Sequence, residues 1–253
     1  MNQVVEDPRV SCPIVCGEYR AATGFFYSDE EFTYLVTARH NVLPTFGENL
    51  RTGELDDTAQ SGEYLPKIDV YLRAKRDFIV WSLDIRESNS VVEVPEIDVI
   101  MIPFAGDPEG YGYQIWNKED VSSVQYPPGK RDVIGYNSTS FPDADCSYDV
   151  TTLYSEIDQP VIHSVEDLNL YLERPRHYGT LTAGIDPTFA GDHDEFKGLS
   201  GAPVLGQGLL GVYSRGGKTE LNMLNQSGGD TSSLVYYTQA DVLPWMIDNA
   251  VVE

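Results

Sequence analysis

Positive charge is scarce in this sequence. Only 17 lysine and arginine residues stand against 40 aspartate and glutamate residues, which gives a formal net charge of −23 at pH 7. An acidic surface of this kind repels phosphate backbones and anionic lipids. Nucleic acids and membrane surfaces are therefore excluded as expected partners.

Lysine is scarcer than arginine, with 6 residues against 11, and the acidic residues are spread along the whole chain. This composition is typical of proteins from halophilic archaea, in which high salt screens the repulsion between surface charges. The alternative is an ordinary acidic cytosolic protein. Because the charge is not confined to a tail, the halophilic interpretation is favoured.

Cysteine is also rare. Cys12, Cys16 and Cys146 are an odd number, so they do not form a disulfide framework. Cys12 and Cys16 could form a local bridge or supply two metal ligands, but no nearby histidine or cysteine pair completes a metal site. We therefore expect plain thiols and no metal.

Long apolar runs are missing, and none approaches the length of a membrane span. The first 16 residues contain acidic side chains where a signal peptide would have a basic start and a long apolar core. The sequence therefore predicts a soluble, cytoplasmic protein.

Helical periodicity is scarce too, whereas short β-branched and aromatic runs recur between clusters of glycine, proline, asparagine and aspartate. This pattern predicts an all-β protein with many short strands. Pro244 suits the first turn of one short C-terminal helix over 241–250. The predicted strands lie within 13–26, 32–37, 68–72, 78–83, 99–102, 132–136, 181–185, 202–205 and 209–213. The segment 126–130 (YPPGK) is the candidate linker, and long loops are expected at 42–67, 137–175 and 217–233.

Three segments carry side chains suited to acyl transfer. His40 follows an apolar strand, and histidine is the usual general base near neutral pH. Asp98 directly precedes the apolar run 99–102, where a buried carboxylate needs a hydrogen-bond donor such as an imidazole N–H. The alternatives are a structural histidine and an aspartate in a turn.

Ser200 lies in the third segment, Gly198-Leu-Ser-Gly-Ala-Pro-Val204. A nucleophilic hydroxyl for acyl transfer needs backbone N–H groups aimed at the developing oxyanion. The glycines around Ser200 allow the unusual turn that would direct such amides inward. The alternative is an ordinary turn with the same residues.

His40, Asp98 and Ser200, in this order, together resemble the chymotrypsin/trypsin-like serine peptidases. Two further stretches, Thr23-Gly-Phe-Phe26 and Gly211-Val-Tyr-Ser-Arg-Gly216, resemble strands of that family. The resemblance spans about residues 13–250. It implies two antiparallel six-stranded β-barrels, over 1–126 and 127–253, with the short helix ending the second.

By the same resemblance, His40, Asp98 and Ser200 form a catalytic triad, and the amides of Gly198 and Ser200 form the oxyanion hole. Ser214, Arg215 and Gly216 would bind the substrate backbone. Asp194 would lie at the base of the specificity pocket and favour arginine or lysine in the substrate; the alternative is a solvated loop residue. The implied function is a trypsin-like serine endopeptidase acting on proteins or peptides, without a cofactor.

The chain departs from the secreted members of that family at two positions. Asn41 stands where many of them carry a disulfide cysteine. Leu199 replaces the aspartate that binds a newly cut N-terminus, so the chain more closely resembles the intracellular bacterial and archaeal branch. Two rival functions stay open: a catalytically silent protein-binding module on the same fold, and a serine esterase or acyltransferase.

Overall fold

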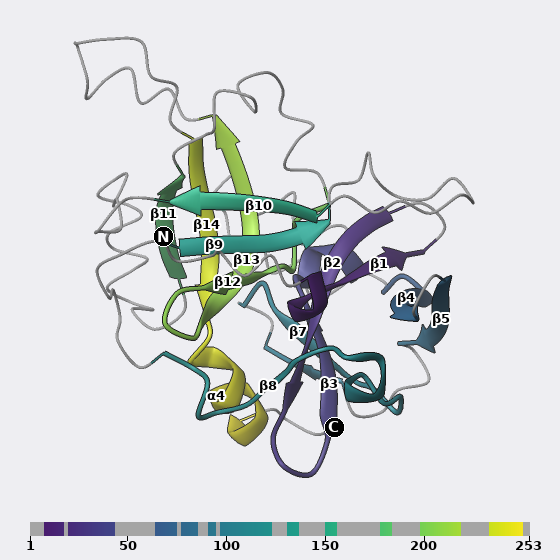
Figure 1. Ribbon diagram of the computed structural model, residues 1–253. Helices are drawn as coiled ribbons and strands as arrows, with labels where there is room; N and C mark the ends of the chain where they lie inside the picture. Colours follow the sequence, from purple (N-terminus) through teal and green to yellow (C-terminus); the bar gives the residue numbers. More distant parts are fainter. Residues whose placement is uncertain are drawn as a thin grey trace, which may run out of the picture.

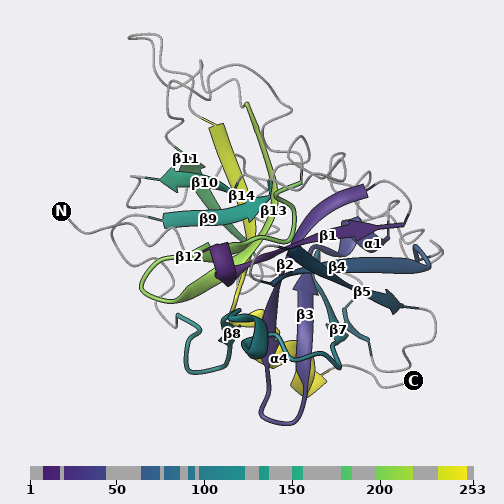
Figure 2. The same cartoon turned by 45° about the vertical axis from the view of Figure 1, so that its right-hand side comes forward.

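Two curled β-sheets, one from each half of the chain, dominate the structure (Figures 1 and 2). The computed structural model describes residues 8–17, 20–43, 64–74, 77–85, 91–94, 97–122, 131–136, 150–155, 178–183, 198–218 and 233–249. The candidate linker at 126–130 and the third cysteine, Cys146, lie outside these ranges.

The first sheet has the order β5-β4-β1-β2-β3-β7-β6, and β8 pairs with β2. Six of its strands are antiparallel and four to nine residues long, and the two-residue strands β6 and β8 are added to them. The strands are β1 (Cys12–Cys16), β2 (Arg20–Ser28), β3 (Thr33–Thr37), β4 (Lys67–Ala74), β5 (Asp77–Asp84), β6 (Val92–Glu93), β7 (Ile100–Pro103) and β8 (Ile115–Trp116).

The second sheet has the order β10-β9-β12-β13-β14-β11 and is antiparallel throughout. In Figure 1, β9 and β10 run across β13 and β14, which shows how strongly this sheet curls. Its strands are β9 (Arg131–Tyr136), β10 (Val150–Ser155), β11 (Tyr178–Ala183), β12 (Pro203–Leu205), β13 (Leu209–Lys218) and β14 (Ser233–Gln239).

Four short helices complete the described structure. The α-helices are α1 (Arg39–Val42) and α4 (Val242–Asn249), and the 3-10 helices are η1 (Pro8–Val10) and η3 (Glu109–Tyr111). The predicted all-β class with a short C-terminal helix is therefore confirmed.

The strands β2, β3 and β7 of the first sheet are apolar on both faces because each face meets a different core. Alternate residues of a strand point to opposite sides. Phe26 and Leu35 enter the interior of the first sheet with Cys12 and Cys16. Their neighbours Phe25 and Val36 instead enter a second cluster, which also contains residues of the other half of the chain.

This second cluster joins the two halves of the molecule. Ile134 of β9, together with Leu209 and Val212 of β13, packs in it beside the first-sheet residues. The helix α4 adds Val242, Leu243 and Met246, so the C-terminal segment also packs against the first half. A separate cluster around Val133, Leu199 and Tyr213 fills the second sheet. Burial of apolar area is thus continuous across the boundary between the sheets.

Several predicted element bounds need correction. The strand predicted at 181–185 is β11, which begins three residues earlier and ends at Ala183. Four strands, β6, β8, β10 and β14, were not predicted. The short helix α1, which carries His40, was not predicted either, because four residues are too few to show a helical period.

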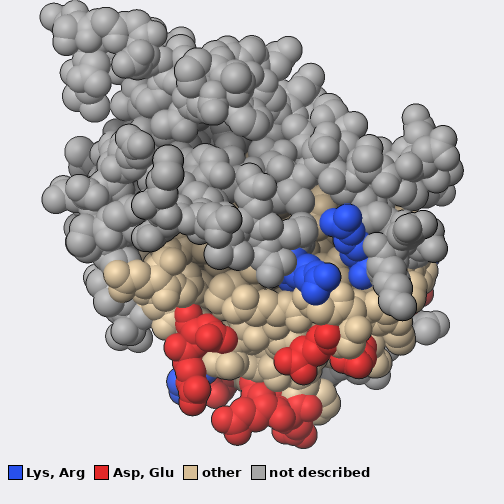
Figure 3. Space-filling view, viewed as in Figure 1, with Lys and Arg blue, Asp and Glu red and all other residues tan. Residues whose placement is uncertain are grey.

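Cys12 and Cys16 are buried thiols and are not joined in a disulfide, as expected. Burial raises the pKa of the Cys12 thiol, so this side chain stays protonated and packs as a small apolar group. None of the helices in the described ranges is long and apolar enough to span a bilayer. Acidic side chains gather on the lower part of the face seen in Figure 3.

Two phenylalanines test the core of the first sheet. Phe26 is 1% exposed and contacts the rings of Phe104 and Tyr113, whereas Phe32, in the turn before β3, is 50% exposed. We expect Phe26→Ala to lower the free energy of unfolding by about 3–5 kcal/mol, through lost burial and the cavity left behind. Phe32→Ala, the matched control, should change it by less than about 1 kcal/mol. Urea unfolding measures both, and equal losses would contradict the assigned core.

Candidate active site

His40 is delivered to the site by the end of β3. The strand stops at Thr37, and the single turn of α1 begins at Arg39, closed by a bond from the Leu43 amide to the Arg39 carbonyl. Arg39 is buried and forms an ion pair with Glu93 of β6, with 2.7 Å between Nε and Oε2. This pair fixes the helical turn against the first sheet, and the ring of His40 is held beside it.

Asp98 lies just before β7 and is 1% exposed. Its Oδ2 is 2.8 Å from His40 Nδ1, and its Oδ1 is 3.1 Å from the same nitrogen. Its Oδ1 also accepts the backbone N–H of His40 at 3.0 Å. Because the carboxylate can only accept from Nδ1, the contact favours the tautomer with its proton on Nδ1.

Ser214 completes the surroundings of this carboxylate from the other half of the chain. Its hydroxyl donates a short hydrogen bond to Asp98 Oδ2. Ser214 lies where the pairing register of β13 with β14 shifts, between Tyr213 and Arg215. Such an irregularity re-aims a residue that would otherwise take part in the ladder. The side chain is buried and reaches across to the first half.

The charge of Asp98 is stabilised despite its burial. Desolvation by itself would raise the pKa of this carboxyl. Attraction to His40 and the hydrogen bonds from His40 and Ser214 outweigh desolvation and hold the pKa of Asp98 below its ordinary value. The carboxylate is therefore ionised wherever the protein is folded near neutral pH.

Ser200 lies in a tight turn between the two sheets. The backbone of Gly198 has φ 94° and that of Gly201 has φ 91°, a region that favours glycine. A Cβ atom at Gly201 would lie 2.2 Å from the carbonyl oxygen of Thr23 and from the hydroxyl of Thr37, so no larger residue fits there. The two glycines therefore set the path of the chain on both sides of Ser200.

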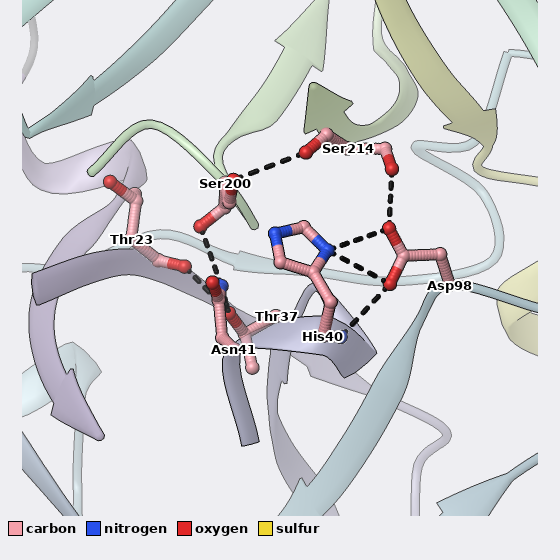
Figure 4. A network of polar contacts seen from close by, with 7 residues as sticks. All are labelled: Thr23, Thr37, His40, Asn41, Asp98, Ser200 and Ser214. Atoms are coloured by element: carbon pink, nitrogen blue, oxygen red, sulfur yellow. Dashed lines mark hydrogen bonds and ion pairs between the residues drawn. The ribbon is translucent and has the colours of Figure 1, made fainter. Parts of the chain in front are cut away.

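The imidazole of His40 lies between Asp98 and Ser200, with its second nitrogen turned toward the Ser200 side (Figure 4). In this structure the Ser200 hydroxyl donates to the carbonyl oxygen of Ser214 at 3.1 Å. Ser214 thus contacts both Asp98, through its side chain, and Ser200, through its backbone. The structure brings the three residues predicted as a triad into one place.

Two backbone amides of the turn differ from its carbonyl groups in their partners. Within the described part of the chain, no acceptor is bonded to the N–H groups of Gly198 and Ser200. The carbonyl groups of the same turn are occupied, since Gly198 O accepts from the Thr23 hydroxyl at 2.7 Å and Leu199 O accepts from the Ala202 amide at 2.8 Å. A pair of unused amides beside a hydroxyl can stabilise a developing oxyanion.

The remaining predicted site residues are described only in part. Arg215 and Gly216 belong to β13, and Gly216 pairs with Val235 of β14. Asp194 lies outside the described residues. The substrate-binding roles of these residues, and of Ser214, stay predictions. Among the described residues, no group of three or more histidine, cysteine, aspartate or glutamate side chains is placed to hold a metal ion.

Sequence reasoning missed the polar contacts that hold the turn. The Thr23 hydroxyl donates to Gly198 O and accepts the Tyr136 amide at 2.9 Å, so it touches two segments of the second half. The Thr37 hydroxyl donates to Thr23 O at 2.8 Å. Asn41 donates to Ser200 O at 2.9 Å. Small polar residues do stand beside the motif residues, in Thr23-Gly24 and His40-Asn41, but such residues are common in turns and at strand ends, so the sequence alone does not single them out.

Comparisons with known proteins place the fold. No protein family and no curated protein matches the sequence. Among solved structures, the chain is similar to a thermostable serine protease, AL20, from an extremophilic microorganism, with 9% identity and a TM-score of 0.53, covering 98% of this chain and 99% of that chain. It is also similar to a Glu endopeptidase, with 13% identity and a TM-score of 0.52, covering 96% of this chain and 91% of that chain.

An HtrA-type protease, AlgW, solved with a tripeptide, has 14% identity and a TM-score of 0.49 over 97% of this chain. This chain spans 61% of the length of that protein. The two structures with the higher TM-scores are matched over nearly their whole lengths. The chain therefore has the chymotrypsin-like two-barrel fold.

The lowered pKa of Asp98 predicts how stability depends on pH. A carboxyl whose pKa is lower in the folded than in the unfolded protein stabilises the fold above its unfolded value of about 3.9, and this contribution is lost as the pH falls through the folded value. We expect Asp98→Asn to cost about 3 kcal/mol at pH 7. The difference from the wild type should begin to shrink below about pH 5 and continue to shrink as the pH falls below the unfolded value.

Urea unfolding at several pH values measures this difference. Asp248→Asn, which changes an exposed carboxyl on α4, is the control and should follow the wild type at every pH. A difference between wild type and Asp98→Asn that stays constant across the range would contradict the assignment.

Proposed function

We propose that this protein is a serine endopeptidase that cleaves peptide bonds through His40, Asp98 and Ser200. One observation supports the proposal most: a buried, ionised Asp98 holds Nδ1 of His40 at 2.8 Å, on the side of the ring away from Ser200. A carboxylate in this position orients an imidazole and stabilises its protonated form. The similarity in fold to serine proteases adds support but does not by itself imply activity.

In the proposed reaction, the Ser200 hydroxyl turns from the Ser214 carbonyl toward His40 and attacks the carbonyl carbon of the substrate. His40 takes the proton on Nε2 as the bond to Ser200 Oγ forms, and Asp98 stabilises the resulting imidazolium. The amides of Gly198 and Ser200 donate to the oxyanion. His40 then gives the proton to the leaving amine. In the second half of the reaction, His40 takes a proton from the water that attacks the acyl-enzyme and returns it to Ser200 Oγ as the acid product leaves.

The proposed domains are 1–126, which carries His40 and Asp98, and 127–253, which carries Ser200. Each domain then supplies part of the reaction, and the substrate would bind where the two sheets meet. Ser214, Arg215 and Gly216 would pair with the substrate backbone. These roles of the two domains rest on the proposed peptidase activity.

Substrate preference is the finer part of the proposal. Asp194, six residues before Ser200, would favour arginine or lysine on the acyl side of the cleaved bond, since a carboxylate pairs with a cation. One protein of similar fold is a Glu endopeptidase by name, so the fold accommodates other preferences. The acidic, lysine-poor composition supports an origin in a salt-adapted archaeon and activity in high salt.

The main alternative function is a protein-binding module that has the same fold but no catalytic activity. Intact His40, Asp98 and Ser200, with unused amides at Gly198 and Ser200, favour the enzyme, because a binding module has no need of them. A serine esterase of the α/β-hydrolase type would place its serine between a strand and a helix. Here Ser200 is followed by β12, which disfavours that rival.

Labelling with a fluorophosphonate probe tests the proposed reaction. In high-salt buffer, we expect the wild type to be labelled and both Ser200→Ala and His40→Ala to lose labelling. The turnover of peptide substrates should fall by roughly 10⁶ in Ser200→Ala if the three side chains act as a unit. Circular dichroism establishes that the variants are folded. An unlabelled, folded wild type at every salt concentration would favour the binding module.

A panel of peptides that differ at one residue tests the preference. We expect cleavage after arginine or lysine to exceed cleavage after glutamate by roughly 10²-fold or more, because an unpaired carboxylate repels an acidic side chain. Asp194→Ser should remove most of the difference while Ser200 stays reactive toward the probe. Preferred cleavage after any other residue type would rule out the role of Asp194.

A further inference from the structure

The carbonyl oxygen of Ser200 is held by two donors from the other half of the molecule. The backbone amide of Thr23 donates to it at 3.0 Å. Nδ2 of Asn41 donates to it at 2.9 Å (Figure 4). The amide that follows, Gly201 N, donates to Tyr213 O at 2.8 Å. The peptide group after Ser200 is therefore fixed from both sides, by the first half through its oxygen and by the second half through its nitrogen.

Asn41 is well suited to this contact because it follows His40 directly on the single turn of α1. It is 2% exposed, and its amide nitrogen donates a second bond to the Thr37 hydroxyl at 3.0 Å. That hydroxyl in turn donates to Thr23 O. Both N–H groups of the Asn41 side-chain amide thus have acceptors, one on Ser200 and one on Thr37.

The chain of contacts links the proposed base to the proposed nucleophile through the backbone. The turn that fixes the ring of His40 also carries the side chain that fixes the carbonyl of Ser200. A shift of Ser200 by about 1 Å relative to a reacting group can cost roughly 10²-fold in rate. We infer that Asn41 is a positioning residue, which keeps the hydroxyl of Ser200 at the correct distance and orientation relative to His40. This inference rests on the proposed peptidase activity.

A purely structural role would have different consequences. A side chain that only joined the two halves would lower the stability of the protein, and the molecules that stayed folded would react at the normal rate. A positioning residue instead changes the rate in folded molecules. It lowers kcat and leaves KM nearly unchanged, because the substrate still binds while the hydroxyl is misplaced.

Asn41→Asp separates these roles because the new side chain has nearly the same size but no N–H donor when ionised. Its oxygens would face the Ser200 carbonyl, another acceptor. We expect kcat and the rate of fluorophosphonate labelling to fall roughly 10²-fold, with KM changed less than about threefold. The assays are run well below the unfolding temperature of each variant. If Asn41→Asp does not fold, the same fall is expected in Asn41→Ser, which keeps a hydroxyl but is too short to reach Ser200 O.

Thr37 supplies a matched pair that tests the orientation of Asn41. Thr37→Ser keeps the hydroxyl that accepts from Asn41, so we expect kcat within about threefold of the wild type. Thr37→Val keeps the shape but loses the hydroxyl, so kcat should fall toward that of the Asn41 variant. Similar rates in Thr37→Val and Thr37→Ser would count against the contact chain.

The outcomes distinguish this inference from the proposed function. If the wild type is labelled through Ser200 and folded Asn41→Asp keeps the wild-type kcat, the inference is wrong and the proposed function stands, even if the variant is less stable. If the wild type does not react, or if Ser200→Ala is labelled equally, the proposed function fails and the inference fails with it.

Discussion

The requirement to satisfy one buried carboxylate organises the centre of this molecule. Asp98 is almost fully withdrawn from water, and an ionised group in that position is costly unless donors surround it. Two donors come from His40 and one comes from Ser214, in the second half of the chain. The turn of α1, the register shift in β13 and the approach of the two sheets can all be understood as ways to bring these donors to one carboxylate.

The three residues proposed to carry the chemistry could be predicted because each has a local signal. A histidine at a strand end, an aspartate before an apolar run and a serine between glycines are visible in single segments. Their order along the chain then supported the prediction that they act together. Thr23, Thr37 and Asn41 have no such signal, because small polar residues are common in turns and at strand ends. Their importance arises from contacts with residues up to 175 positions away in the sequence, which no local pattern can indicate.

The strands show the same limit. The segments that form β3, β4, β5 and β7 are apolar and β-branched, so the sequence predicts their ends to within two residues. β14 has an equally favourable composition, Ser-Leu-Val-Tyr-Tyr-Thr-Gln. It was not predicted because it lies between a polar stretch and the C-terminal helix. β10 is half threonine and serine, and its pairing with β9 rather than its composition defines it as a strand.

The distribution of the Asp98 donors also determines when the site can exist during synthesis. His40 and Asp98 leave the ribosome long before Ser214, and at about 5–20 residues per second the delay amounts to several seconds or more. During most of that interval the first half of the chain lacks both this donor to its buried carboxylate and the turn that carries Ser200. A nascent chain of the proposed peptidase therefore has no complete site until its second half has been synthesised and has folded.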